Sequence, residues 1–223
     1  MSAAPLLVAL LALQSPLDEG TLVVREDTAE IAREAFRLTP ARVAAGAGWT
    51  LASTARYNRG RPVVLDPIVE LGPDSAPASL EYTVADPREP QRILGQLNRG
   101  RFTVRVLGRR TERAREFPAT PPAAILDDSV LALYLAAAWQ ARSQPAALTG
   151  IFPRPGGGRR EALMVQDLGI QSTTLNRDHA SLRHITVTGG ANQVVHVWLG
   201  ADGRLLKVEI PSRRLTAQRL PAP

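Results

Sequence analysis

The stretch that decides the fold is Asp127–Arg142, DDSVLALYLAAAWQAR. All ten residues of Val130–Trp139 are apolar, so a helix here has no polar side over nearly three turns. Such a helix must be buried on more than one side. A flat sheet covers one side only, so a strongly curved sheet wrapped around the helix is the economical arrangement. Asp127 and Asp128 stand where carboxylates cap a first turn, and Pro145 prevents much continuation.

Outside this helix the chain has the pattern of strands, with apolar and polar residues alternating between turn signals. The clearest hairpin runs from Val195 to Ile210 around Gly200–Gly203. Strands this close, with no helices between them, pair antiparallel. We therefore predict a mainly β protein, a half-barrel or β-roll meander of about 9–11 strands wrapped around one buried helix at about 127–142. The expected strands are 21–26, 50–57, 62–71, 79–85, 101–107, 162–165, 170–175, 182–188, 193–199 and 205–210.

One early segment is ambiguous. Asp27–Glu30 resembles a capping box, and Ile31, Ala35 and Leu38 keep helical spacing. The same residues fit a hairpin loop at 27–30 with a return strand at 31–38, which the surrounding meander favours. The proline-rich segments 118–122 and 153–158 are interpreted as loops, because neither side alone has enough strands to close a core. The prediction is a single β-rich domain at 21–221.

Composition and charge narrow the class of protein. The chain has no cysteine, which excludes disulfides, thiol nucleophiles and thiolate zinc sites. The formal net charge is +6, and Lys207 is the only lysine, so the excess positive charge is arginine. A basic protein is attracted to anionic surfaces, although a bias toward arginine in the coding sequence explains the composition equally well.

The N-terminus carries a short apolar run, Leu6–Leu13 (LLVALLAL). A run of this length is too short to span a bilayer and fits the apolar region of a cleaved secretory signal. We expect residues 1–20 to be a signal peptide and the protein to be periplasmic or secreted. The alternative is a first core strand or helix.

A search for catalytic motifs finds none of the common nucleotide, metalloprotease or hydrolase signatures in the sequence. Gly156–Gly158 could cradle a phosphate, although a surface turn is the simpler interpretation. His184 and His196 could become neighbours on adjacent strands, which would give a weak metal site or a proton-transfer pair. Ordinary surface or half-buried histidines are the simpler interpretation. We expect a non-enzymatic protein without cofactor or metal.

Arginines are concentrated in one predicted hairpin, at residues 101–115. Arginines alternate with apolar residues along 101–107 and return along 111–115. If the two strands pair, we expect four arginines on one face and two at the tip, where they could bind anionic headgroups or phosphates. The alternative is a solvated face balanced by Glu112 and Glu116. The candidate residues for an anionic surface are Arg101, Arg105, Arg109, Arg110, Arg113 and Arg115.

Six strings of the sequence together carry a resemblance to a known group: Ile125–Ala138, Ile151–Pro153, Val197–Leu199, Gly203–Pro211, Val24–Leu38 and Gly48–Trp49. On these strings the chain resembles uncharacterised exported bacterial β-proteins, which are similar in architecture to the half-barrel lipoprotein carriers of the LolA/LolB type. The resemblance implies a curved half-barrel closed over an apolar cavity and a hydrophobic ligand as partner. This chain departs from those carriers because it lacks a lipobox cysteine and has one firm helix.

Three functions follow from these observations. The first is an exported carrier or sensor of a hydrophobic or amphipathic ligand, such as a lipid, held in the curved sheet. The second is an envelope scaffold or interaction protein, docking on an anionic membrane surface or an envelope protein, whose core is filled by its own helix. The third is a basic nucleic-acid binder, which the lack of interleaved aromatic residues disfavours. The cavity or lid candidates are Val130, Tyr134, Trp139, Trp49 and Trp198.

Overall fold

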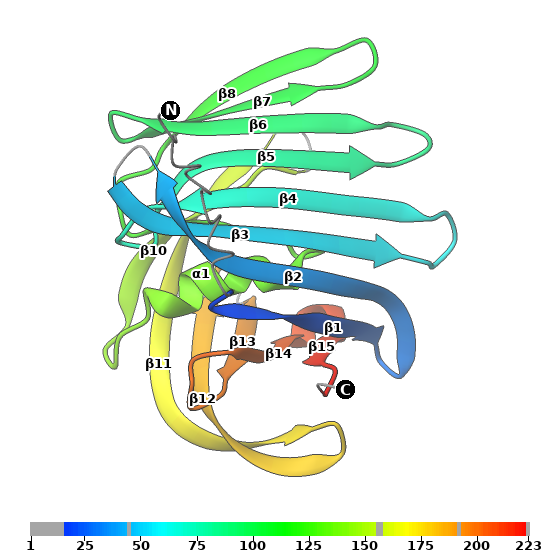
Figure 1. Ribbon diagram of the computed structural model, residues 1–223, viewed down its shortest axis with the longest axis vertical. Coiled ribbons are helices and arrows are strands. Elements are labelled where there is room, and N and C mark those ends of the chain that lie inside the picture. The colour runs from blue at the N-terminus through cyan, green and yellow to red at the C-terminus, as the bar shows by residue number, and fades with distance from the viewer. Residues whose placement is uncertain (1–15, 44–45, 155–157, 191–192, 222–223) are drawn as a thin grey trace, which may run out of the picture.

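The computed structural model describes residues 16–43, 46–154, 158–190 and 193–221. These residues form one strongly curved sheet of 15 strands, which bends around a short helix (Figure 1). The sheet confirms the predicted fold class, a curved, mainly β structure around one helix. The two edges of the sheet, strands β8 and β9, are not paired with each other, so the half-barrel stays open along one seam.

The sheet is built from two runs of strands joined at the first and last strands. Its order is β8-β7-β6-β5-β4-β3-β2-β1-β15-β14-β13-β12-β11-β10-β9. The first run is β1 (Asp18–Glu26), β2 (Ala29–Val43), β3 (Gly46–Tyr57), β4 (Val63–Leu71), β5 (Pro77–Ala85), β6 (Gln91–Asn98), β7 (Arg101–Leu107) and β8 (Glu112–Pro118). The second is β9 (Ala123–Ile125), β10 (Ala146–Phe152), β11 (Arg159–Leu175), β12 (Asp178–Thr188), β13 (Val194–Leu199), β14 (Leu205–Ile210) and β15 (Leu215–Arg219).

The sheet differs from the prediction in the number of strands and in one pairing. The expected count of about 9–11 strands was too low, because β6, β9, β10 and β15 had not been predicted. The segments expected at 162–165 and 170–175 are one strand, β11, with a register shift between Asp167 and Ile170. The expectation of antiparallel pairing throughout was wrong for β9, which runs parallel to β10. Residues 126–145, which include the helix, separate β9 from β10. They supply the long crossover connection that parallel strands need.

The ambiguous early segment is a hairpin. The chain turns at Asp27, whose φ is 54°, and β2 returns along β1 from Ala29. Aspartate tolerates this left-handed backbone better than most residues. The strand interpretation of 31–38 is therefore confirmed, while Asp18–Gly20, at the end of the predicted leader, belong to β1. The rest of that leader lies almost wholly outside the described residues.

The helix is shorter than predicted and starts later. A 3-10 turn, η1 (Leu131–Leu133), leads into the α-helix α1 (Tyr134–Trp139). Val130 has an extended backbone and forms an isolated β-bridge with Asp127, so the segment 127–130 is a loop instead of a first helical turn. The expected cap at Asp127 was therefore wrong. The cap comes from Glu34 of β2, far away in the sequence.

The helix fills the concave side of the sheet. Every residue from Val130 to Ala138 is at most 3% exposed, and inward-facing side chains from both runs of strands belong to the same apolar cluster. Packing a continuous core of this kind is the main source of stability. No helix in the described part of the chain is long and apolar enough to cross a membrane.

Candidate functional site: a groove at the open seam

A buried carboxylate anchors the start of the helix. Glu34 is fully buried, and its two carboxylate oxygens accept hydrogen bonds from the backbone N–H groups of Leu131 (2.8 Å) and Ala132 (2.9 Å). The hydroxyl of Ser53 donates a third bond at 2.8 Å. Burial raises the pKa of Glu34 to about 7, although these three hydrogen bonds favour the ionised form. The first orphan N–H groups of the helix are thus satisfied from a neighbouring strand.

A second carboxylate, Asp127, binds both a core tyrosine and an arginine beside the open seam between β8 and β9. It accepts bonds from the Tyr82 hydroxyl (2.8 Å) and the Ser129 backbone N–H (2.9 Å). Arg154 forms a bidentate pair with it, at 2.6 Å from Nε and 2.9 Å from Nη2. Burial and the negative charge of Asp127 raise the pKa of Tyr82, which therefore stays a protonated donor. Fork-shaped pairs of this type fix orientation as well as charge, so Arg154 is held rigidly.

Two of the candidate cavity residues lie in the apolar core. Val130 and Tyr134 are buried in the core, and the Tyr134 hydroxyl donates to Asp128 at 2.6 Å. Trp139 and Trp49 do meet, with ring centroids 5.6 Å apart in an edge-to-face contact. This aromatic pair packs against the core cluster and closes it. In the described residues, the hollow beside Tyr134 has a volume of only about 10 Å³.

A larger hollow lies at the open seam, and we call it the seam groove. Its volume is about 350 Å³, within the usual range for small-molecule sites. One side is the concave face of β5–β8 near the turns that join them, and the other side is the segment that follows β10. The lining residues are Val84, Asp86, Glu89, Gln91, Val106, Gly108, Thr111, Arg113, Pro153 and Arg154.

The seam beside the groove is held by contacts between the two runs of strands. Arg115 of β8 donates from Nη1 to the carbonyl of Gly158, just before β11, at 3.1 Å. Phe117 lies so close to Gly158 that an added Cβ would sit 3.4 Å from its ring, at a backbone φ of +91°. Thus the seam is bridged near Phe117, while the groove opens at the other end of β8.

The arginine hairpin exists, but its arginines are divided between two faces. Thr103 is opposite Glu116, so Arg101 and Arg105 lie on the convex face and pair with Glu116 and Glu112 at 2.8 and 2.6 Å. Arg113 and Arg115 are opposite the buried Val106 and Val104 and point to the concave side. The expectation of four arginines on one face was therefore wrong, because the register places glutamates on the convex face instead.

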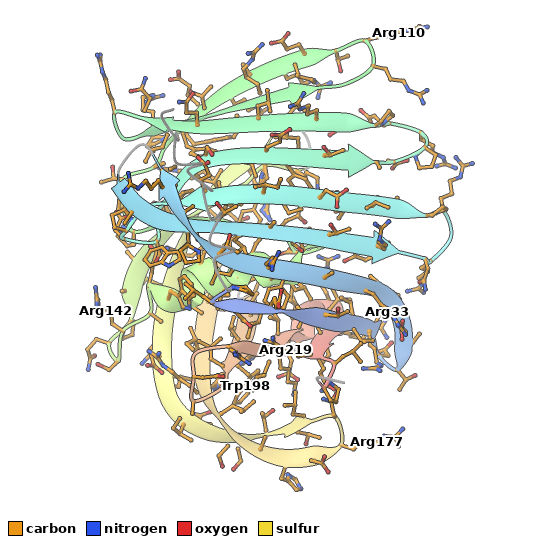
Figure 2. The ribbon with its side chains drawn as sticks, in the orientation of Figure 1. Arg33, Arg110, Arg142, Arg177, Trp198 and Arg219 are labelled. Atoms are coloured by element: carbon orange, nitrogen blue, oxygen red, sulfur yellow. The ribbon has the colours of Figure 1, made fainter. Side chains whose placement is uncertain are left out.

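The two arginines at the tip of this hairpin, Arg109 and Arg110, lie in the turn between β7 and β8. Figure 2 shows Arg110 at the end of the β7–β8 turn, pointing away from the sheet. Arg109 reaches the neighbouring β5–β6 turn, where its Nη2 is 3.4 Å from the carbonyl of Pro87. Of the predicted surface arginines, only Arg113 lines the seam groove.

Trp198 is on the outer face of β13, not in the interior where it had been expected. Its neighbours Val197 and Leu199 face the core, while its ring stacks on His184 with centroids 3.9 Å apart. The indole N–H donates to Glu209 at 3.0 Å. Lys207 binds the same carboxylate at 2.9 Å, and its Nζ also donates to Thr173 Oγ1 and the Thr174 carbonyl, both at 3.0 Å. We call this the outer cluster. It fastens the β11–β12 hairpin onto β14.

The predicted contact between two histidines occurs within the outer cluster. His184 Nε2 is 2.8 Å from His196 Nδ1, and His184 Nδ1 is 2.7 Å from Gln171 Oε1. Since the amide oxygen only accepts, His184 donates from Nδ1 and, when neutral, accepts at Nε2. Burial and the neighbouring His196 lower the pKa of His184. No group of three or more potential ligands for a metal occurs in the described residues.

The predicted phosphate cradle at Gly156–Gly158 lies mostly outside the described residues. Of its three glycines, the structure describes only Gly158.

Two residues of the candidate site, Glu34 and Arg154, were not predicted from the sequence. Glu34 could have been found, because it shares its strand parity with the apolar residues Ala32 and Phe36. Arg154 carries no comparable signal, since its role depends on the distant Asp127.

Comparison with solved structures supports the fold. The chain is similar to the crystal structure of a β-barrel-like protein of domain of unknown function DUF1849 from Brucella abortus. That likeness has a TM-score of 0.54 and 12% identity, covering 91% of this chain and 93% of the other. A DUF1089 family protein from Pseudomonas aeruginosa is also similar, with a TM-score of 0.49, 13% identity, and 83% and 92% coverage. No family model and no curated protein sequence matches the chain.

These comparisons reach as far as architecture. The Brucella structure shares a barrel-like fold with this chain over nearly the whole of both molecules. The Brucella protein is named by a domain of unknown function, in agreement with the resemblance to uncharacterised β-rich proteins. At these identities function does not follow from fold, so the site must be argued from its own chemistry.

Proposed function

We propose that this protein is a non-enzymatic, exported binding protein that holds a small amphipathic ligand in the seam groove. The observation that carries the proposal is the distribution of space. The interior is occupied by the protein's own helix, whereas the groove of about 350 Å³ is lined by both apolar and charged side chains. A concave site that combines apolar and polar lining groups can hold and orient an amphipathic ligand.

The groove is also well supported from behind. Arg154 projects from a rigid bidentate pair with Asp127, and Asp127 is fixed in turn by Tyr82 and Ser129. A side chain held in this way loses little conformational entropy when a ligand binds. Arg154 is therefore a preorganised contact.

Export and a role in carrying lipids belong to the same proposal. The apolar run Leu6–Leu13 supports a secretory signal, and the resemblance to half-barrel carriers of the LolA/LolB type supports a ligand with an apolar part. The position of the ligand differs from that resemblance. We place the ligand at the edge of the half-barrel, with its apolar part against Val84, Val106 and Pro153.

Native mass spectrometry of the full chain, purified from a bacterial envelope without detergent, tests the proposal. We expect a mature mass lower by the N-terminal segment that precedes β1, and a discrete adduct that is retained or is regained after exposure to lipid extract. Thr111→Trp should abolish the adduct, because Thr111 is exposed and lines the groove. The matched control is Ser172→Trp, at an exposed position of β11. A bound adduct that persists in Thr111→Trp but disappears in Trp139→Ala would place the ligand in the interior and contradict the proposal.

A second function is favoured by one observation, the complete burial of Val130–Ala138. A core that is filled by its own helix suits an envelope scaffold that binds other proteins or an anionic membrane surface. This function requires that the processed protein carry no adduct under any loading condition. It also requires that Thr111→Trp leave every measured interaction unchanged.

A further inference from the structure

The charges in the seam groove are arranged by element. The carboxylates Asp86 and Glu89 come from the β5–β6 turn, whereas the guanidinium groups come from β8 (Arg113) and from the segment after β10 (Arg154). The Arg154 guanidinium lies beside β5, 5.7 Å from the centroid of the Tyr82 ring, whereas Arg113 is on β8. The groove therefore carries charged groups of both signs.

The charged groups of the groove keep unused bonding capacity. Asp86 Oδ1 accepts the backbone N–H of Arg88 at 2.8 Å, which leaves Oδ2 available. Arg154 uses Nε and Nη2 for Asp127, which leaves Nη1 available. Within the described ranges neither Glu89 nor Arg113 forms an ion pair, although Arg105 and Glu112 on the opposite face of the same hairpin do. Asp86, Glu89 and Arg113 line one groove without pairing with each other, so they are suited to a ligand that carries both signs.

We propose that the seam groove recognises a zwitterionic amphiphile: a headgroup with an ammonium and a phosphate or carboxylate, attached to an apolar chain. The ammonium lies between Asp86 and Glu89, the anionic group contacts Arg113 and Arg154 Nη1, and the chain lies over Val84, Val106 and Pro153. This inference rests on the proposed function and specifies the ligand's headgroup.

A ligand of a single charge fits the groove less well. A pure anion would gain contacts with Arg113 and Arg154 but would be repelled by the carboxylates of the β5–β6 turn. A pure cation would meet the reverse situation. Only a headgroup with both charges pairs every available group, and charge-assisted hydrogen bonds are about twice as strong as neutral ones. The discrimination arises from repulsion of the wrong headgroup as well as attraction of the right one.

Three amphiphiles with the same twelve-carbon chain test this inference by calorimetric titration of the full protein, below the concentrations at which they form micelles. They are dodecylphosphocholine, dodecyl phosphate and dodecyltrimethylammonium. We expect dodecylphosphocholine to bind at least about tenfold more tightly than either of the others, a difference of about 1.4 kcal/mol. Phosphocholine without the chain should bind at least about tenfold more weakly than dodecylphosphocholine.

Two variants assign the ends of the headgroup. Arg113→Gln should weaken dodecylphosphocholine about tenfold and leave dodecyltrimethylammonium unchanged or tighter. Glu89→Gln should weaken dodecylphosphocholine and leave dodecyl phosphate unchanged or tighter. Arg105→Gln and Glu112→Gln, on the convex face of the β7–β8 hairpin, are the matched controls and should change nothing.

The possible failures are distinguishable. If dodecyl phosphate binds as tightly as dodecylphosphocholine, or if Glu89→Gln has no effect, the zwitterion inference is overturned while the groove remains a binding site. If free phosphocholine binds as tightly as dodecylphosphocholine, the ligand is a soluble zwitterion and the amphiphile part is overturned. If none of the three amphiphiles binds in a manner blocked by Thr111→Trp, the proposed function fails as well.

Discussion

Two polar clusters lie on opposite faces of the same sheet, and they differ in what they hold in place. The inner cluster, Glu34, Ser53, Tyr82, Asp127 and Arg154, fixes the loop and helix inside the half-barrel. The outer cluster around Trp198 fastens one hairpin to the outside of β14. The inner contacts are shared by the whole core, whereas the outer ones are local. The same kinds of side chain therefore affect global stability in one place and a local opening in the other.

Removing Glu34 should produce the largest effect. Glu34→Ala leaves the N–H groups of Leu131 and Ala132 without acceptors inside the core, so we expect the free energy of unfolding to fall by about 3–5 kcal/mol. Urea denaturation followed by tryptophan fluorescence measures this change. Glu34→Gln keeps the shape and one acceptor oxygen and should lose distinctly less. An equal loss in both variants would mean that packing, and not the acceptor role, makes this residue important.

The inner and outer clusters should change the stability of the protein in opposite directions as the pH changes. The raised pKa of Glu34, about 7, means that the folded state binds a proton more tightly than the unfolded one. Its contribution is fully present below pH 4.5 and is lost as the pH rises through about 7, a change of about 3 kcal/mol. The lowered pKa of His184 acts in the opposite direction. Its contribution is present above pH 6.5 and is lost as the pH falls through the folded-state pKa.

Denaturation between pH 4 and pH 8 checks these signs when three chains are compared. Glu34→Gln should remove the loss of stability on going from acidic to neutral pH. His184→Gln should remove only the smaller loss at acidic pH, which NMR signals of the β11–β12 hairpin report locally. Identical pH profiles in the parent chain and Glu34→Gln would contradict the assignment of the inner cluster.

Lys207 provides a test of the outer cluster alone. Lys207→Met keeps most of the apolar stem but removes the bonds to Thr173, Thr174 and Glu209. We expect a loss of about 1–2 kcal/mol, together with faster hydrogen exchange confined to 170–180. Ligand binding in the seam groove should stay unchanged. Faster exchange around Leu131 as well would show that the two clusters are coupled through the sheet.

The smallest effect is expected on the convex face. Arg105 and Glu112 are both about half exposed, at 52% and 55%, and their ion pair of 2.6 Å lies in water. Exposed pairs contribute little, so Arg105→Gln should change stability by less than about 0.5 kcal/mol. Thermal denaturation at low and high salt measures it. A loss of stability as large as that of Lys207→Met would mean that ion pairs on the convex face contribute substantially to stability.

The features that could be predicted from the sequence are those that depend on a local pattern of apolar and polar residues. The unbroken apolar run Val130–Trp139 was enough to infer a buried helix and a curved sheet, and the hairpin at Val195–Ile210 was confirmed as β13 and β14. Strands β6 and β10 were missed because a glycine interrupts each pattern. A Cβ at Gly95 would meet the Phe102 ring at 2.5 Å, and one at Gly150 would meet Leu163 at 2.5 Å. Those glycines make room for side chains on neighbouring strands, which a single strand cannot reveal.

The candidate site was harder to predict, because it depends on register and on distant elements. Arg113 and Arg105 look equivalent in the sequence, yet the pairing of Arg113 with the buried Val106 turns it into the groove. Arg154 reaches the same groove from the other run of strands. The strand β9, with three residues, was too short for alternation to reveal, and β15, with five, was also missed.

The pairing of β1 with β15 has a consequence for the timing of folding. Leu22 is bonded in register with Arg219, so the two runs of strands are joined by a contact that spans almost the whole described chain. Contacts of such high sequence separation slow folding, because a long loop must close before they form. The two halves of the sheet cannot unite until β15 has left the ribosome. The complete sheet therefore forms only after nearly the whole of the described chain has been synthesised.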